Sequence, residues 1–464
     1  MSATMTTTSG PAPRPTPTEP RSYHFPAFER RTLPNGMRLL VAPVSKLPLV
    51  SITAVVDAGA SVEREGEDGV ATLTAQLLLE GAGGLDGAAL TDRFERIGTS
   101  VDAHADWDAA TVSLTVLAER LPDALALVRD LLRTPEFPDR EVARLKDERL
   151  AELLQLRAEP GALADEQFAR AVYAPTARYA TLAGGNATSV RAMTRDVVRD
   201  FYDERYRPST TTLVFAGDVS VERAEALTRE LFGDWHGVAG PTSARAVDAS
   251  PPTRIVRVVA KTDAPQSELR VGHAGLPRRH PDYFDATVMN AVLGGLFSSR
   301  INLNLREVHG YTYGAFSAFE WRRAAGPFVI QTAVKSDVTG AAVREILHEI
   351  ERMRSAEIST DELTLATSYL DGVFPIRYET TSAIATALSN LVIHDLPERF
   401  YDEYRARVRG VTTEGVLRAA QRHLHPDRLH IVVVGDPAVV VTPLADIHGA
   451  PVDVVTPDGT EVAA

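Results

Sequence analysis

The chain has 464 residues and a formal net charge of −13 at pH 7, with 44% hydrophobic and 24% charged residues. This length is too great for one hydrophobic core and indicates two to four domains, and the composition excludes a disordered protein. The acidic balance argues against nucleic acid and anionic membranes as partners. The chain contains no cysteine, which excludes disulfides, Cys-zinc sites and thiol nucleophiles.

The chain begins with a lead, residues 1–25, that is rich in Thr and Pro and has no basic segment followed by an apolar one. Such a composition is typical of a solvated, disordered segment and not of a signal peptide. No apolar run approaches the roughly 20 residues that a membrane-spanning helix needs. We therefore expect a soluble, cytoplasmic protein.

A strand-like run, Leu49–Gly59, leads through an acidic loop to a helix predicted over Gly69–Gly81, GVATLTAQLLLEG. Its apolar residues fall at the spacing of a core-facing helix side: Val70, Leu73, Leu77 and Leu78. Lys46 and Pro48 occupy the turn that precedes the strand, which favours a hairpin. Taken alone, the helix is an ordinary buried one.

The chain repeats one pattern near residue 210 and again near residue 430. Pro208–Gly217 and Pro426–Gly435 each contain a Pro-marked turn and a buried apolar strand, followed by a Gly-Asp turn. A helix precedes each copy. The repeat predicts two similar halves that face each other across a chamber. Because many strands have the pattern of hairpin partners, we expect an α+β fold, each half with a mainly antiparallel or mixed sheet covered by helices.

The domain boundaries follow from this repeat. We predict an N-terminal domain over residues 26–237 and a small-residue, Pro-bearing linker over 238–253. A C-terminal domain over 254–440 and a tail over 441–464 follow.

The longest patterned segment of the second half is Asn290–Phe319. It predicts a helix, a Gly-Gly break and a second helix that ends Leu-Arg-Glu, after which Gly-x-Thr-Tyr opens a strand. Arg306 and Tyr313 of this segment carry hydrogen-bond donors that can contact a bound molecule. The alternative is a helix-end salt bridge between Arg306 and Glu307, with Tyr313 packed on the sheet.

These segments resemble the pitrilysin, insulinase and mitochondrial-processing-peptidase superfamily over roughly residues 26–437. In that superfamily the helix matching Gly69–Gly81 usually carries His-x-x-Glu-His, whose two His hold zinc and whose Glu activates the metal-bound water. Here those positions hold Thr72, Ala75 and Gln76, and none of the three is a useful zinc ligand or base. Glu152 matches the family's third ligand, although we favour a solvated helix charge at this position.

The resemblance is greatest to the zinc-free, Arg/Tyr-bearing subunits of bacterial heteromeric members. It implies a non-catalytic subunit that binds peptides or small unfolded polypeptides through Arg306 and Tyr313. A zinc-bearing partner subunit of similar length would then carry out the cleavage, so the chain itself would need no cofactor. The alternative function is a purely structural or interaction protein of the same fold.

We also searched the sequence for a replacement metal site. The chain has twelve His, and no two of them lie at i and i+4, so no second zinc helix is predicted. His423 and His425 are two residues apart and point in different directions. Three ligands brought together from distant segments stay open as an alternative.

Overall fold

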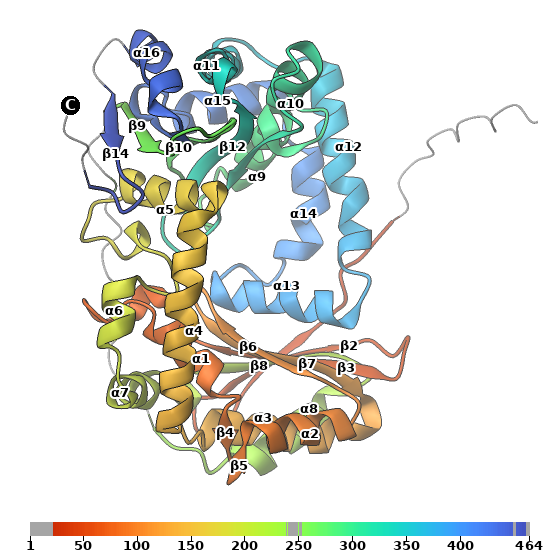
Figure 1. The fold of residues 1–464 in the computed structure, drawn as a ribbon. Helices are drawn as coiled ribbons and strands as arrows, with labels where there is room; N and C mark the ends of the chain where they lie inside the picture. Colours follow the sequence, from red (N-terminus) through yellow and green to blue (C-terminus); the bar gives the residue numbers. More distant parts are fainter. Residues whose placement is uncertain (1–21, 238, 240–248, 250–252, 449–451, 461–464) are drawn as a thin grey trace, which may run out of the picture.

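The computed structural model describes residues 22–237, 239, 249, 253–448 and 452–460. The expected lead lies outside the described residues as far as residue 21, and so does most of the expected linker. Each half of the chain forms one six-stranded sheet with helices packed on it (Figure 1). A short two-stranded sheet, β4 (Gly81–Ala82) and β5 (Leu85–Asp86), follows the first helix.

The first sheet has the strand order β1-β2-β8-β3-β7-β6, in which β2 and β8 are parallel and the other neighbours antiparallel. In β7, the buried residues Ala110, Val112, Leu114 and Val116 alternate with more exposed Thr and Ser, as expected for a strand with one covered face. β8 is buried throughout because both of its faces are covered. The strands are β1 (Glu29–Thr32), β2 (Arg38–Pro43), β3 (Leu49–Val56), β6 (Val101–Ala105), β7 (Ala110–Leu117) and β8 (Thr211–Gly217).

The second sheet repeats this arrangement, with the order β11-β12-β10-β13-β9-β14. β13, like β8, lies between one parallel and one antiparallel neighbour. The predicted α+β fold of two similar halves with mixed sheets is thus confirmed. The strands are β9 (Ile255–Ala260), β10 (Gln266–Ala274), β11 (Ala315–Phe319), β12 (Pro327–Lys335), β13 (His430–Gly435) and β14 (Asp453–Val455).

Some helices of each half pack on its own sheet, and others pack on neighbouring helices. The helices of the first half are α1 (Val70–Leu77), α2 (Gly87–Arg96), α3 (Leu121–Arg133), α4 (Asp139–Ala158), α5 (Pro160–Val172), α6 (Ala187–Ala192), α7 (Arg195–Arg205) and α8 (Val221–Phe232). Those of the second are α9 (Tyr283–Asn290), α10 (Arg300–Asn302), α11 (Thr339–Ser355), α12 (Thr360–Arg377), α13 (Thr381–Ile393), α14 (Phe400–Arg409), α15 (Thr413–His423) and α16 (Pro437–His448). No helix among the described residues is long and apolar enough to cross a membrane.

Two helices are exchanged between the halves. α5 of the first half packs on β10 and β13 of the second sheet, and α13 of the second half packs on β3 and β8 of the first (Figure 1). Phe168 of α5 shares a buried cluster with Val432 and Val434, and the Ser51 and Thr381 hydroxyls lie 2.9 Å apart under α13. The halves therefore share their cores, and an open chamber between them stays a prediction.

Both ends of the described chain differ from the expected boundaries. Tyr23 and Phe25, assigned to the lead, pack on aromatic rings of the second half, with Phe25 stacked on Tyr401 at 4.7 Å between ring centroids. β14, assigned to the tail, pairs in parallel with β9. Both segments are short, and their burial depends on contacts that are distant in sequence.

Two buried histidines of the second sheet predict a loss of stability in mild acid. His273 on β10 and His430 on β13 are almost inaccessible to solvent, and burial lowers the pKa of each to about 4. The unfolded chain binds a proton on each below about pH 6.5, so the free energy of unfolding falls as the pH drops from 6.5 toward 4. Between pH 7 and pH 5 each histidine should contribute about 2 kcal/mol to this loss.

Urea unfolding of wild-type and His273→Gln chains at pH 7 and pH 5 measures this effect. Between pH 7 and pH 5, the free energy of unfolding of the variant should fall by about 2 kcal/mol less than that of the wild type. Val271→Ala serves as the control, since this buried residue of β10 carries no titratable group and its loss should lower stability equally at both pH values. Equal pH dependence in wild type and His273→Gln would contradict the prediction.

Candidate functional site

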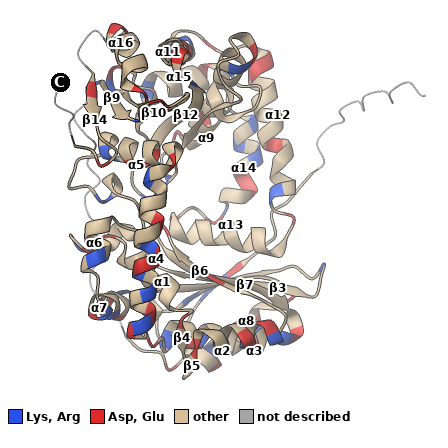
Figure 2. Cartoon of the chain, in the orientation of Figure 1, with Lys and Arg blue, Asp and Glu red and all other residues tan. Residues whose placement is uncertain are grey.

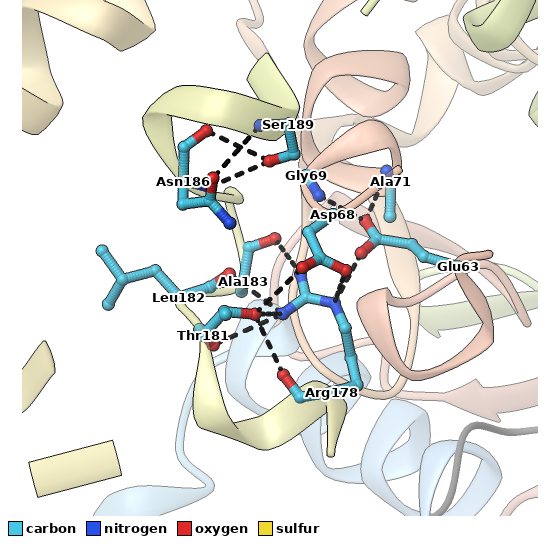
Figure 3. A network of polar contacts seen from close by, with 10 residues as sticks. All are labelled: Glu63, Asp68, Gly69, Ala71, Arg178, Thr181, Leu182, Ala183, Asn186 and Ser189. Atoms are coloured by element: carbon cyan, nitrogen blue, oxygen red, sulfur yellow. Dashed lines mark hydrogen bonds and ion pairs between the residues drawn. The ribbon is translucent and has the colours of Figure 1, made fainter. Parts of the chain in front are cut away.

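The N-terminal end of α1 is held by a buried ion pair (Figure 3). Glu63 accepts hydrogen bonds from the backbone N–H groups of Gly69 and Ala71 at 3.1 and 2.9 Å, and Arg178 Nε donates to its second oxygen at 2.6 Å. Burial raises the pKa of Glu63 to about 7, against the opposing effect of Arg178 and the two N–H groups. The carboxylate supplies partners to N–H groups that a helix end leaves unsatisfied.

The same network also orders the loop that follows Arg178 and approaches the start of α1. The Arg178 guanidinium also donates to oxygen atoms of Thr181, Leu182 and Ala183, which orders the loop that approaches α1. Gly69 begins α1 with a φ of 98°, and a Cβ there would lie 2.7 Å from the carbonyl oxygen of Gly184. Only glycine fits this position, because both the backbone conformation and the space exclude a side chain.

The three positions that match the zinc motif lie on α1 in different surroundings. Ala75 is fully buried, Thr72 is half-buried and Gln76 is exposed. The Thr72 hydroxyl is a buried atom with no hydrogen-bond partner among the described residues. Thr72 and Gln76 line a small pocket together with Lys146 and Arg149 of α4.

The two cations that face α1 are held in place by backbone carbonyls. Arg149 Nε donates to Gly184 at 3.0 Å, and Lys146 Nζ donates to Arg191 at 3.2 Å. Glu152, the predicted third-ligand position, is 56% exposed and pairs with Arg149 at 2.7 Å instead of lining the pocket. Figure 2 shows the charged residues along α4.

The residues around this pocket do not fit a zinc ion. Structural and catalytic zinc sites use imidazole, thiolate or carboxylate ligands. Those lining the described pocket offer a hydroxyl, an amide and two cations, which would repel the metal. That the chain holds no zinc at α1 stays a prediction, and no step of catalysis is derived from this pocket.

The second predicted site lies on a segment with two π-helical turns, Ala291–Gly295 and Leu303–Val308. Such turns are rare and occur frequently at functional sites. Arg306 lies in the second turn, where its guanidinium stands 4.7 Å from the centroid of the Phe297 ring and 3.3 Å from Glu307. The ion pair with Glu307 agrees with the alternative interpretation of Arg306.

Tyr313 does not agree with that alternative, because its side chain is 92% exposed and is not packed on the sheet. Its loop is nevertheless held firmly. The Asn302 side chain accepts from Ala315 N at 3.0 Å and donates to the Phe297 carbonyl at 2.6 Å, and the Thr332 hydroxyl donates to Gly314 O at 2.9 Å. No hydrogen bond joins Arg306 to Tyr313 within the described residues.

Tyr313 belongs to a group of exposed apolar side chains in and around the second π-helical turn, η6 (Leu303–Val308), and we call this group the η6 apolar surface. Its members are Phe297, Leu303, Val308, Tyr313 and Phe316. Soluble proteins rarely expose several large apolar side chains together unless another molecule covers them. The sequence pointed to Arg306 and Tyr313 but not to this surface, because its residues have no periodic pattern.

Comparisons with known proteins agree with both halves of the fold. The family model described as "Insulinase (Peptidase family M16)" matches residues 41–185, and that described as "Peptidase M16 inactive domain" matches residues 192–370. An uncharacterized zinc protease of Mycobacterium tuberculosis is 25% identical over 430 residues, which are 91% of this chain and 96% of that protein. A probable mitochondrial-processing peptidase subunit beta of Arabidopsis thaliana is 22% identical, over 87% of this chain and 77% of its own length.

Two solved structures extend the similarity to the three-dimensional fold. The crystal structure of a peptidase M16 inactive domain from Pseudomonas fluorescens superposes with a TM-score of 0.82 at 26% identity, covering 88% of this chain and 98% of that one. A protease from Helicobacter pylori gives a TM-score of 0.83 at 17% identity, covering 88% of this chain and all of that one.

Proposed function

The chain belongs to the insulinase family of peptidases, M16, and from this premise we propose that it is a substrate-binding subunit without catalytic activity of its own. It would act with a zinc-bearing subunit of similar length in a complex that degrades peptides. The partner would supply the zinc and cleave the peptide bond. The proposal retains the expected cytoplasmic location, which cell fractionation tests.

The observation that carries this proposal is the contrast between the two sites. At α1, Lys146 and Arg149 face the positions where a peptidase of this family would hold its metal. At the η6 apolar surface, a firmly held loop presents Tyr313 to solvent, seven residues after Arg306. A surface that is both apolar and rich in hydrogen-bond donors suits a peptide, whose backbone carbonyls and side chains need both kinds of contact.

The proposed roles follow from the donors that the two side chains carry. The Arg306 guanidinium would donate to a peptide carbonyl and fix the register of the bound chain. The Tyr313 hydroxyl would donate to the oxygen on which negative charge develops. Tyr313 is poised for this because its loop is held by Asn302 and Thr332, so little ordering is needed when the peptide binds.

The proposal predicts that the purified chain cleaves no peptide, with or without added Zn²⁺, because neither Thr72, Ala75 nor Gln76 can activate water. A quenched-fluorescence peptide library measures this directly. Adding a zinc-bearing M16 subunit should produce cleavage that exceeds the cleavage by that subunit alone. Chelator-sensitive hydrolysis by this chain alone would contradict the proposal, and binding without any gain in cleavage would favour the structural alternative.

A further inference from the structure

A cluster of two histidines and one aspartate lies in the second half and shares no residue with the α1 pocket or the η6 apolar surface. His280 and Asp282 belong to the loop before α9, and His423 is the last residue of α15. One candidate ligand atom from each residue lies within 4.8 Å of the other two. The cluster joins segments that are 141 residues apart, so sequence spacing does not reveal it.

Both histidines contact Asp282, one at its carboxylate and the other at its backbone. His423 Nε2 lies 2.7 Å from Asp282 Oδ2, and His280 Nδ1 accepts the backbone N–H of Asp282 at 3.1 Å. The two imidazole rings meet edge to face, with centroids 5.0 Å apart. All three side chains are half-buried, so an ion can reach them from solvent while the surrounding protein restricts their rotation.

The surroundings of the cluster carry charges of both signs. Asp285, in the first turn of α9, adds a second negative charge nearby, whereas Arg422 Nη1 stands 3.6 Å from Asp282 Oδ2 and competes with a bound cation.

We propose that His280, Asp282 and His423 bind one divalent transition-metal ion of the zinc class and thereby tie the start of α9 to the end of α15. Two imidazoles and a carboxylate are ligands that zinc and related ions prefer over calcium or magnesium. Tetrahedral zinc holds its ligand atoms roughly 3.3 Å apart. The candidate ligand atoms, which lie within 4.8 Å of one another, therefore need to move only slightly closer together. Side-chain rotation in the loop before α9 can provide this movement. The site does not depend on the proposed function.

Isothermal titration of the metal-free, full-length chain with Zn²⁺ tests the proposal. One ion should bind per chain, and His280→Ala and His423→Ala should each weaken binding at least tenfold. Arg422→Gln should tighten binding several-fold, because it removes the competing cation. Zn²⁺ should raise the melting temperature of the wild-type chain and not that of the two alanine variants.

Two control variants locate the ion. His104 Nδ1 also lies 2.8 Å from a carboxylate, that of Asp102, but this exposed pair has only two ligands, so His104→Ala should leave binding unchanged. Gln76→Ala should also leave it unchanged, since that residue lies on α1. Circular dichroism of the metal-free variants checks that each is folded. If an alanine variant is not folded, Asp282→Asn, which keeps the side-chain shape, is used in its place.

The proposal is overturned if the wild-type chain shows no saturable Zn²⁺ binding. It is also overturned if folded His280→Ala and His423→Ala chains keep wild-type affinity, or if Gln76→Ala abolishes binding. The visible absorption bands of bound Co²⁺ give a second readout, because they should appear with the wild-type chain and with His104→Ala but not with His423→Ala.

Discussion

Replacing Tyr313 by Phe or Arg306 by Ala should lower peptide hydrolysis by the two-subunit complex about a hundredfold to a thousandfold, equivalent to about 2.7–4 kcal/mol of transition-state stabilisation. The reason is that, in the proposed function, each change removes a donor directed at the peptide, while the zinc stays in the partner. Tyr313→Phe is the sharper of the two, because it removes one oxygen atom from a side chain that is 92% exposed and contributes little to the fold.

The assay needs the zinc-bearing partner at saturating concentration, and partner affinity and zinc content must be measured on the same samples. Arg279→Ala is a suitable control, since Arg279 forms an exposed ion pair with Asp395 outside the η6 apolar surface and should not alter hydrolysis. Full activity in both Arg306→Ala and Tyr313→Phe would assign these residues a structural role and favour a scaffold function. Loss of partner binding would instead show that the surface is covered by the partner.

Replacing Glu63 by Gln should destabilise the chain by about 3 kcal/mol, because the buried Arg178 guanidinium loses its carboxylate partner at 2.6 Å and keeps only that of Asp68, at 3.5 Å. Neither side chain of this pair has accessible surface, so water cannot replace the lost contact. The change should also loosen the start of α1, because Glu63 accepts hydrogen bonds from the N–H groups of Gly69 and Ala71 and an amide keeps only one of its two oxygens. Urea unfolding followed by circular dichroism measures the loss, and exposed Asp123→Asn, which breaks a surface pair with Arg120, should cost less than about 1 kcal/mol.

The two partners of this pair should respond differently to pH. An Arg keeps its charge, whereas Glu63, whose pKa burial raises, can take up a proton. In Arg178→Met the folded-state pKa of Glu63 stays above its unfolded value, so stability should be greater at pH 6 than at pH 8. Glu63→Gln should show no such gain in stability at pH 6, because it lacks the carboxyl group that takes up the proton. Equal pH dependence of the two variants would contradict this explanation.

Local patterns were sufficient to predict the class of the fold. The paired segments Pro208–Gly217 and Pro426–Gly435 became β8 and β13, the equivalent strands of the two sheets. The helix predicted over Gly69–Gly81 became α1 at Val70–Leu77. These features depend on residues close in sequence, namely apolar periodicity and the turn-forming residues at each end, and such signals act before any tertiary contact forms.

The candidate site was predictable only in part. The family resemblance placed Thr72, Ala75 and Gln76 at the positions of a metal motif, since this requires only aligning the residues of one helix. It did not show that Lys146 and Arg149 face them, because the pairing of α1 with α4 depends on how two helices cross. Similarly, Tyr313 was identified, but its exposure depends on Asn302 and Thr332, which hold its loop from other elements.

The sequence by itself thus determined the two-half α+β architecture and the absence of a zinc motif on α1. Only the tertiary structure decided the exchange of α5 and α13 between the halves and the meeting of His280 and Asp282 with His423. Both results bring together residues more than a hundred positions apart. Such contacts depend on strand order and on which sheet faces remain uncovered, and no local periodicity or spacing encodes either of these.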